Sequence, residues 1–374
     1  MKHYILGDVV DVISERENNP SLSGYERFVG LKHYVSGDVE IKKYGTTENL
    51  NSAMKVFKSG DILVARRNVY LKRASVVYFD GLTSGDSIVL RAKNENIGRV
   101  LPFILNTSEF WDYANQHADG TMSKRLSPKV LKAYEFDLPD DNELEELADL
   151  LWSLVDTKNA YEELLIKTDD LVKSQFIEQI ENDDRIPKTK LGELFDISSG
   201  GTPARRKSEY WDDGRIPWVK ISDMKSRYVT ETEEFITELG LENSSAKLYK
   251  AGTFLISIFA TLGEVSILDI DATTNQAIAG MVPKGDIDVE YTYIALNQLK
   301  DHIIEIGRGA AQNNINLSIL KELVIPMPEE KIRQEFSEFV QQTDRSKFEL
   351  QQVIESTDNL IKSILYSNLE EKKE

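Results

Sequence analysis

The sequence of 374 residues contains an internal repeat, and each copy ends in a long segment with helical periodicity. Between Pro139 and Asn182, apolar residues recur at the three-, four- and seven-residue steps that place them on one helix face. They are Leu147, Leu151, Leu154, Tyr161, Leu165, Val172 and Phe176. A second such segment begins at Pro328, and the string TDDLVKS at 168–174 returns as TDNLIKS at 357–363, after 189 residues. Chance similarity between two amphipathic helices would explain the periodicity but not this matched string.

Helices of this length restrict the folds that the chain can adopt. An uninterrupted helix of forty-odd residues is about 60 Å long at 1.5 Å per residue, which is more than an ordinary globular domain needs. Each helix is therefore expected to be a spacer. Because the two helices share one apolar pattern, we expect them to bury it together as an antiparallel coiled-coil pair.

The segments ahead of the helices also match, in the same order. The matched segments are 6–11 with 191–196, 55–63 with 247–255, and 131–139 with 320–328. Short β-rich runs bounded by Gly and Asp turns predict mixed α/β units with strands predominating. We therefore predict an α+β fold in which two similar mixed α/β domains are separated by two long helices, as a pseudo-two-fold internal repeat. The expected boundaries are 1–138 and 183–327 for the domains, with 139–182 as the central and 328–374 as the C-terminal spacer helix.

Composition limits the class of protein. The absence of cysteine excludes disulfides and thiolate metal sites and favours a reducing compartment. No run approaches 18 apolar residues, and the N-terminus lacks a basic and apolar leader, so we expect a cytoplasmic protein that does not associate with membranes. The net charge of −18 is concentrated in the helices, since 140–182 carry −10 and 329–374 carry −4. The globular parts are therefore near neutral and can present basic patches.

A series of short motifs in the second copy resembles a known family. The motifs are 191–193 (LGE), 198–203 (SSGGTP), 210–211 (YW), 216–219 (IPWV) and 273–278 (TTNQAI). In this order, and with the repeated helices, the chain resembles the specificity subunit of a type I restriction–modification enzyme over essentially its whole length. The first copy departs from these motifs, because residues 15–18 (EREN) stand where the second has 200–203 (GGTP).

The resemblance implies a DNA-binding protein of a phage-defence system that is not itself an enzyme. Each globular half would be a target recognition domain that reads one part of a bipartite double-stranded DNA sequence. The helices would set the gap between the parts and bind two methyltransferase subunits, and restriction/translocase subunits would join them. The chain itself would hold no cofactor, and S-adenosylmethionine, ATP and Mg would be needed only in the partner subunits for DNA methylation and cleavage.

Basic clusters in the first half are the candidates for DNA contact. Arg suits guanine and Asn suits adenine, while Lys and Tyr suit phosphates. The candidates are Arg66, Arg67, Asn68, Tyr70, Lys72, Arg73, Lys124, Arg125 and Lys129. The alternative for residues 66–73 is a solvated loop whose charges are neutralised by the acidic helices.

The second half offers further candidates for base or phosphate contact. They are Arg205, Arg206, Lys207, Lys220, Lys225, Arg227, Arg308, Gln312, Asn313 and Asn314. For residues 308–314, a polar turn that caps the next helix is an equally good interpretation. Trp211 and Trp218 are expected in the core, not stacked on bases, because their apolar neighbours are typical of buried strands.

The helices carry more apolar surface than a two-stranded seam requires, which predicts contact with another protein. The candidate partner-binding residues are Leu151, Trp152, Val155, Leu164, Ile166, Phe339 and Val340.

Catalytic and metal-binding motifs are absent from the sequence. There is no phosphate-binding Gly-rich loop with Lys-Ser/Thr, no methyltransferase or dinucleotide motif, and the four His residues lack metal-ligand spacing. A non-catalytic recognition subunit is therefore the leading hypothesis. The alternative is an acidic DNA mimic or coiled-coil scaffold that inhibits or assembles DNA enzymes. It is disfavoured because the globular halves hold 35 of the 45 Lys and Arg residues.

Overall fold

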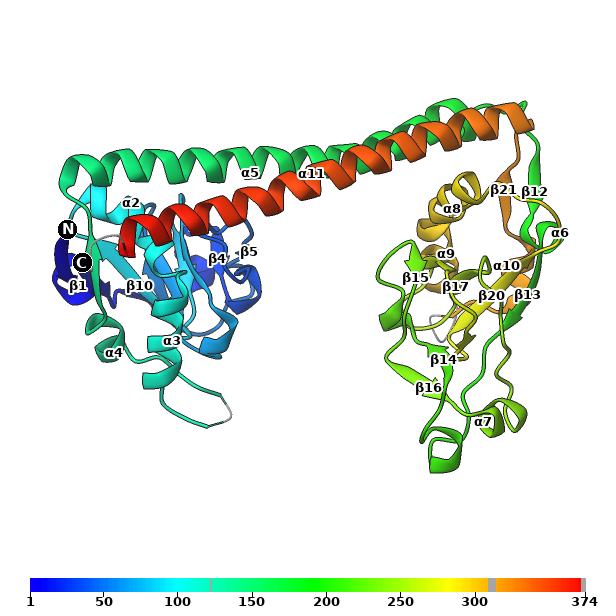
Figure 1. The fold of residues 1–374 in the computed structure, drawn as a ribbon, viewed down its shortest axis with the longest axis horizontal. Coiled ribbons are helices and arrows are strands. Elements are labelled where there is room, and N and C mark those ends of the chain that lie inside the picture. The colour runs from blue at the N-terminus through cyan, green and yellow to red at the C-terminus, as the bar shows by residue number, and fades with distance from the viewer. Residues whose placement is uncertain (122, 309–313, 371–374) are drawn as a thin grey trace. The chain divides into compact units, whose positions relative to one another are not determined.

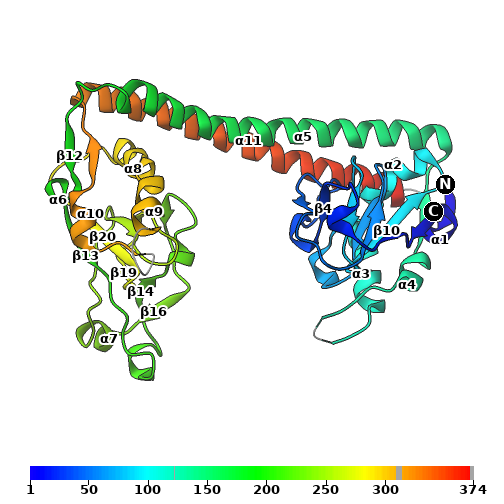
Figure 2. The same ribbon diagram turned by 180° about the vertical axis from the view of Figure 1, so that it is seen from behind.

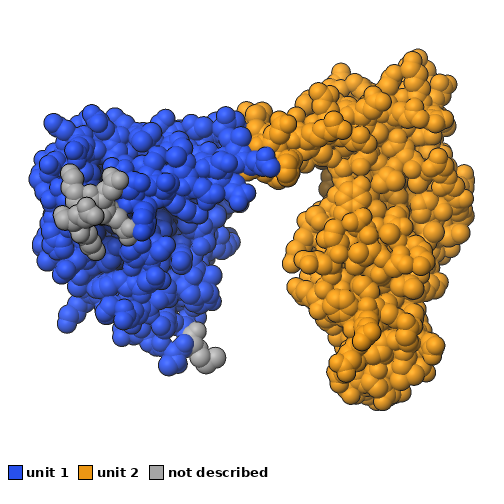
Figure 3. Space-filling model, viewed as in Figure 1, with its two compact units in different colours: residues 1–162, 352–374 blue, residues 163–351 orange. Residues whose placement is uncertain are grey.

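The computed structural model describes residues 1–121, 123–308 and 314–370. The chain divides into two compact units (Figure 3). Unit 1 consists of Met1–Glu162 with the described part of Gln352–Glu374, and unit 2 is Glu163–Gln351. The two long helices are α5 (Asp141–Phe176) and α11 (Glu330–Glu370), and each unit contains one part of each. No helix in the described part of the chain has the length and apolar character needed to cross a membrane.

Unit 1 contains two sheets and a strand pair. The four-stranded sheet has the order β2 (Val10–Ile13), β10 (Ser87–Ala92), β7 (Ile62–Ala65), β8 (Ala74–Val76), and all neighbours are antiparallel. The five-stranded sheet has the order β3 (Arg16–Glu17), β6 (Met54–Phe57), β9 (Gly81–Thr83), β4 (Arg27–Val29), β5 (Gly45–Thr46). β1 (Lys2–Ile5) pairs with β11 (Glu135–Leu138).

The helices of unit 1 pack with the four-stranded sheet around one core. They are α1 (Leu6–Val9), α2 (Glu95–Ile104), α3 (Ser108–His117) and α4 (Pro128–Lys132). Asn94 caps α2 and Thr107 caps α3, since each side chain accepts the backbone N–H three residues further on. Every residue of β7 is buried, as its uninterrupted apolar sequence predicts for a central strand.

Unit 2 has the same plan. Its larger sheet has the order β13 (Phe195–Ser199), β20 (Ile278–Pro283), β17 (Phe254–Ser257), β18 (Val265–Leu268), β15 (Tyr228–Val229). The smaller sheet is β16 (Glu234–Ile236), β14 (Ile216–Val219), β19 (Thr273–Thr274), and β12 (Lys188–Lys190) pairs with β21 (Val324–Pro326). The helices are α6 (Leu191–Leu194), α7 (Glu238–Glu242), α8 (Val289–Gln298), α9 (Lys300–Arg308) and α10 (Leu317–Glu322).

The strand register repeats between the units. In unit 1, Ser87 of β10 pairs with Ala65 of β7, and in unit 2 Ile278 of β20 pairs with Ser257 of β17. These partners lie 191 and 192 residues apart in the chain. The parallel pair β4–β9 in unit 1 likewise corresponds to the parallel pair β14–β19 in unit 2. For these shared strands, the sequence repeat is therefore also a repeat of strand pairing, although the sheets of the two units differ in strand number.

Within each unit, α5 and α11 lie side by side and run antiparallel (Figures 1 and 2). In unit 1, the Lys158 amine lies 2.8 Å from Asp358, and Leu151 and Val155 pack with Leu365. In unit 2, Lys347 forms an ion pair with Asp169. Lys158 and Lys347 are 189 residues apart, as are Asp169 and Asp358, so the two ion pairs are reciprocal copies of one interaction.

Candidate nucleic-acid interface

Two loops of unit 1 join the basic clusters that the sequence singled out. We call residues 66–73 and 119–126 the first loop pair, of which Met122 is not described. The Asn68 N–H donates to the Lys124 carbonyl at 3.0 Å, and the Leu126 N–H donates to the Arg66 carbonyl at 2.8 Å. Arg67 and Arg125 form a β-bridge between the loops. The two predicted clusters, more than fifty residues apart in the chain, therefore form one surface.

The backbone of the first loop pair is held in an unusual conformation. Asn68 and Lys72, on either side of the short helix η3 (Val69–Leu71), have φ of 55° and 48°. A residue other than glycine at positive φ costs of order 1–3 kcal/mol and persists where the surroundings impose it, which is common at functional sites. The surrounding structure therefore fixes the backbone of this loop, which is not a freely solvated segment.

Polar side chains of the first loop pair are tied together at its surface. Ser123 Oγ donates to Asn68 Oδ1 at 3.0 Å and accepts from Arg67 Nε at 3.4 Å. The Arg67 and Arg125 side chains are 46% and 52% exposed. An amide and two guanidinium groups, the side chains best matched to base edges, are therefore presented together.

Five other candidates of this half are also exposed or half-exposed. Tyr70, Lys72 and Lys129 are exposed, while Lys124 is half-buried and donates to the Asn115 carbonyl at 2.6 Å. These positions suit phosphate contacts more than base contacts. Arg66 is also half-buried, and its backbone joins the loops.

Arg73 corrects the interpretation made from the sequence. It is buried, and its guanidinium donates to the backbone carbonyls of Leu31 at 3.1 Å and Arg67 at 3.0 Å. The group lies too deep to reach DNA, and it supports the loop that carries Arg67. Its neighbours in the chain gave no signal of burial, because the loop folds over it.

Unit 2 has an equivalent pair of loops. We call residues 258–264 and 314–316 the second loop pair. Phe259 and Asn314 form a β-bridge, and the Ile315 N–H donates to the Ile258 carbonyl at 3.2 Å. Ala260 has φ of 60° at the position equivalent to Asn68. Each of these features has a counterpart in the first loop pair. The counterparts are separated along the chain by the residue offsets that relate the two copies of the internal repeat.

The second loop pair was only partly found from the sequence. Asn314 was a candidate and lies in it, and Arg308 is exposed at the end of α9. The candidates Gln312 and Asn313 lie outside the described residues. Residues 258–264 were not candidates, because they contain no cation. Their position in the repeat, opposite residues 66–72, was the available signal.

Another predicted basic group of unit 2 is largely neutralised within the unit. Arg205 lies over the rings of Trp211 and Trp218, at 3.7 and 4.7 Å from their centroids, and forms an ion pair with Glu234. Lys220 is paired with Glu234 at 2.9 Å and Lys207 with the Tyr210 hydroxyl at 2.7 Å.

Trp218 is buried, as the sequence predicted. Trp211 was also expected in the core, but it is half-buried. Arg206 and Lys225 are exposed, and neither forms an ion pair with a carboxylate of the described residues. Of this group, these two cations are the better candidates for phosphate contact.

Arg227 also departs from its predicted role. Its guanidinium forms ion pairs with Glu290 of α8 and, at 2.7 Å, with Asp344 of α11, and its side chain is only 19% exposed. It lies over the ring of Tyr293 at 4.8 Å. With two carboxylates already bound, Arg227 fastens the β15 segment to α8 and α11 and is not available to DNA.

The apolar residues of the long helices divide into two groups. Leu151, Val155 and Val340 are buried in the cores of their own units, and Phe339 is half-buried there. Trp152 is half-buried and donates its indole N–H to the Arg99 carbonyl at 2.9 Å. These residues are occupied within the chain, which corrects their prediction as a free partner surface. Leu164 and Ile166, at 47% and 63% exposure, remain exposed.

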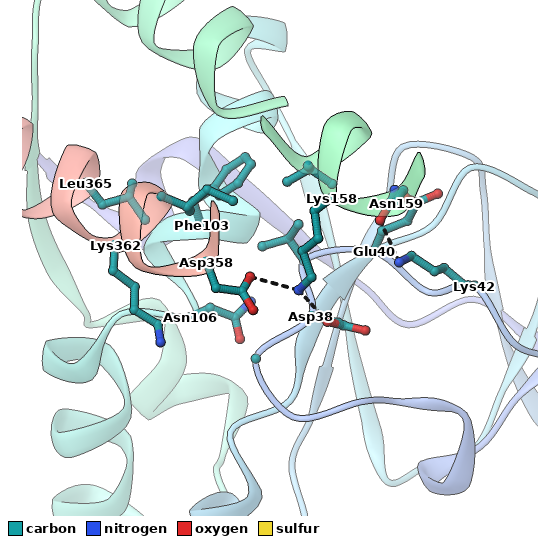
Figure 4. Close-up of a pocket in the computed structure, with 14 residues that line it drawn as sticks. Asp38, Glu40, Lys42, Phe103, Asn106, Lys158, Asn159, Asp358, Lys362 and Leu365 are labelled. Carbon is teal, nitrogen blue, oxygen red and sulfur yellow. Dashed lines mark hydrogen bonds and ion pairs between the residues drawn. The ribbon is translucent and has the colours of Figure 1, made fainter. Parts of the chain in front are cut away.

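A small cavity of about 120 Å³ in unit 1 lies between the segment 37–42, α5 and α11 (Figure 4). The Lys158 amine faces it, at 2.8 Å from Asp358, 3.7 Å from Asp38 and 3.8 Å from Glu162. Burial raises the pKa of Asp38 above its usual value, although Lys158 opposes the shift. Burial alone would lower the pKa of Lys158, but Asp358 and the other carboxylates raise it. The cluster fastens segment 37–42 to both helices. No group of metal-ligating side chains occurs among the residues that the structure describes.

Comparisons with known proteins agree on one family. Residues 186–357 match the model of the type I restriction modification DNA specificity domain. The chain is 25% identical over 297 residues to the EcoR124I/EcoR124II specificity subunit of Escherichia coli, with 73% of each chain covered. It is 29% identical over 162 residues to the MjaIX specificity subunit of Methanocaldococcus jannaschii, which is 41% of this chain and 37% of that subunit.

The fold is also found in a solved structure. A chain from a study of complex assembly and conformational transition of the type I R-M system has a TM-score of 0.62 at 18% identity. The superposition covers 98% of this chain and 97% of that chain. The expected mixed α/β fold and the resemblance stated from the motifs are thereby confirmed, whereas the alternative of an acidic mimic finds no support.

Proposed function

We propose that this chain, which is similar to type I restriction–modification DNA specificity subunits, reads a bipartite DNA target with its two similar globular domains. Residues 1–138 and 183–327 would each read one part of the target. The helices 139–182 and 328–374 would form the antiparallel coiled coil that separates them and sets the gap. The chain would thereby direct methyltransferase and restriction subunits to the site without catalysing a reaction itself.

The observation that carries this proposal is the recurrence of one loop pair in both units. The first loop pair presents Arg67, Asn68 and Arg125, and the second presents Phe259 and Asn314 at the equivalent places. The shared backbone pairing supports one common role, and the different side chains support different sequences read by the two halves. Arg67 and Arg125 suit guanine and Asn68 suits adenine in the major groove.

The methyltransferase subunits are proposed to dock on the exposed apolar residues of the helices. Leu164 and Ile166 are the candidates that the cores of the units leave exposed. S-adenosylmethionine, ATP and Mg would be bound by the partner subunits. An exposed isoleucine on an otherwise acidic helix gains free energy when a partner covers it, which is the physical basis of this assignment.

Methylation mapping and DNA binding test the proposal together. The chain is co-expressed with its methyltransferase, and sequencing of methylated sites gives the target. Fluorescence anisotropy then measures the affinity of the complex for a duplex with that target. Arg67→Ala and Arg125→Ala should each weaken binding by about 1–3 kcal/mol for every base that the arginine recognises.

The matched control is Lys43→Ala, which removes an exposed cation of unit 1 that lies outside the first loop pair. It should leave discrimination between target and scrambled duplexes unchanged. If Arg67→Ala and Arg125→Ala behave like Lys43→Ala, the first loop pair does not read DNA. A complex that methylates DNA without sequence preference would contradict the proposed function itself.

A further inference from the structure

One carboxylate lies between the two exposed arginines of the first loop pair. Asp86 belongs to the turn between β9 and β10, and its carbonyl accepts the Arg66 N–H at 2.9 Å. Its carboxylate, 29% exposed, lies 3.9 Å from Arg67 and 3.7 Å from Arg125. Partly exposed ion pairs of this length are weak, so the guanidinium groups can exchange the carboxylate for another acceptor.

The second loop pair is an internal comparison for this arrangement. Its backbone is the same at this point, because the Ile258 N–H donates to the Ala277 carbonyl at 2.8 Å, as Arg66 does to Asp86. Ala277 therefore stands in the place of Asp86. Phe259 and Asn314 stand in the places of Arg67 and Arg125. The carboxylate is present where the two arginines are present and missing where they are missing, although the backbone does not require it in either unit.

We propose that Asp86 is a specificity-determining residue that makes the first loop pair favour bases over phosphates. This inference rests on the proposed function. Asp86 holds both guanidinium groups over the loops and adds a negative charge at the place where they meet DNA. A phosphate is a full anion, and the carboxylate repels it strongly. The acceptor edge of guanine carries only partial charges, and it is penalised far less. Asp86 therefore weakens sequence-independent binding more than target binding.

Replacement of Asp86 by Asn keeps the size of the side chain and removes its charge. The complex with the methyltransferase is titrated with the target duplex and with two duplexes in which one or the other half-site is scrambled, over a range of salt concentrations. For the duplex with the first half-site scrambled, Asp86→Asn should bind about three- to tenfold more tightly at low salt. The slope of log affinity against log salt should steepen by about one, as expected when one more phosphate is neutralised.

Affinity for the target itself should change less than twofold, so the ratio of target to scrambled binding falls. The ratio for the second half-site should stay as in the wild type, because Ala277 carries no charge there. Asp119→Asn is the matched control. Asp119 is exposed in the same loop pair, and its backbone forms a β-bridge with that of Arg125. Its carboxylate forms no ion pair with a cation of the described residues.

The inference is overturned if Asp86→Asn leaves the ratio unchanged, or if Asp119→Asn lowers it equally, which would indicate a general charge effect. It is also overturned if Asp86→Asn weakens binding to all duplexes and lowers the thermal unfolding midpoint, because the residue would then only support the loop. Failure of the proposed function looks different: the wild-type complex would bind target and scrambled duplexes alike.

Discussion

The ion pairs of Lys158 with Asp358, Asp38 and Glu162 allow us to predict how much unfolding free energy is lost when this lysine is replaced. Lys158→Met keeps most of the side-chain volume and removes the ammonium group that lies within 4 Å of Asp358, Asp38 and Glu162. Three carboxylates then remain close together. Among the described residues, Lys42 forms an ion pair with Glu162 at 2.8 Å and also acts to lower the pKa of Asp38. Exposed pairs contribute up to about 1 kcal/mol, and breaking a buried pair costs about 3–5 kcal/mol. The Lys158 side chain is 15% exposed, so we expect unit 1 to lose about 2 kcal/mol of unfolding free energy.

The loss should depend on pH in a defined direction. Burial raises the pKa of Asp38 in the folded chain, and Lys158 opposes that shift. Without Lys158 the pKa rises further, and the folded state then holds a proton more readily than the unfolded state does. A carboxyl group with a raised folded pKa costs stability as the pH rises through that pKa. The deficit of Lys158→Met should therefore be largest at pH 7 and shrink as the pH falls towards the titration range of carboxylates, about pH 4–5.

Urea unfolding of both variants at several pH values measures this effect. The control is Lys347→Met, the equivalent lysine of the repeat in unit 2. Its partner Asp169 is 65% exposed, so the same substitution should cost only about 0.5 kcal/mol. Equal losses in the two variants, or a loss for Lys158→Met that does not vary with pH, would refute the reasoning from burial.

Three further outcomes are expected. Arg73→Met should lower the unfolding free energy by about 2 kcal/mol, because two partly buried backbone carbonyls lose a charged donor, whereas exposed Lys72→Met should change it by less than about 0.5 kcal/mol in the same urea titration. Ile166→Asp should abolish co-purification with the methyltransferase at an unchanged unfolding midpoint; retained co-purification would place the partner elsewhere. Four residues can be inserted after Glu163 and four after Gln352. The two insertions lie equally far from the Lys158–Asp358 ion pair, and they lengthen both helices by about 6 Å. Since a base pair rises about 3.4 Å, mapped methylation sites should keep both half-sites and gain one or two unread base pairs; an unchanged gap would mean that the helices do not set it.

Features that are local or repeated along the chain could be predicted from the amino-acid sequence. The apolar spacing in 139–182 predicts a helix, and α5 with the π-helical turn Ile177–Glu181 occupies nearly that range. The offset of 189 residues predicts two copies of one α/β plan, and the strand registers of the two units follow it. Periodicity and repetition are properties of neighbouring residues and of aligned segments, so they can be read without a structure.

Which charges and apolar groups remain available depends instead on the folded chain. Arg67 and Arg73 belong to one basic run in the sequence, yet the first is exposed and the second is buried and bound to backbone carbonyls. Arg227 is paired with Asp344, which lies more than a hundred residues further on. Leu151 is covered by α11, whereas Ile166 is exposed. Each outcome depends on which distant segment packs against the side chain, and the neighbouring sequence does not specify that contact.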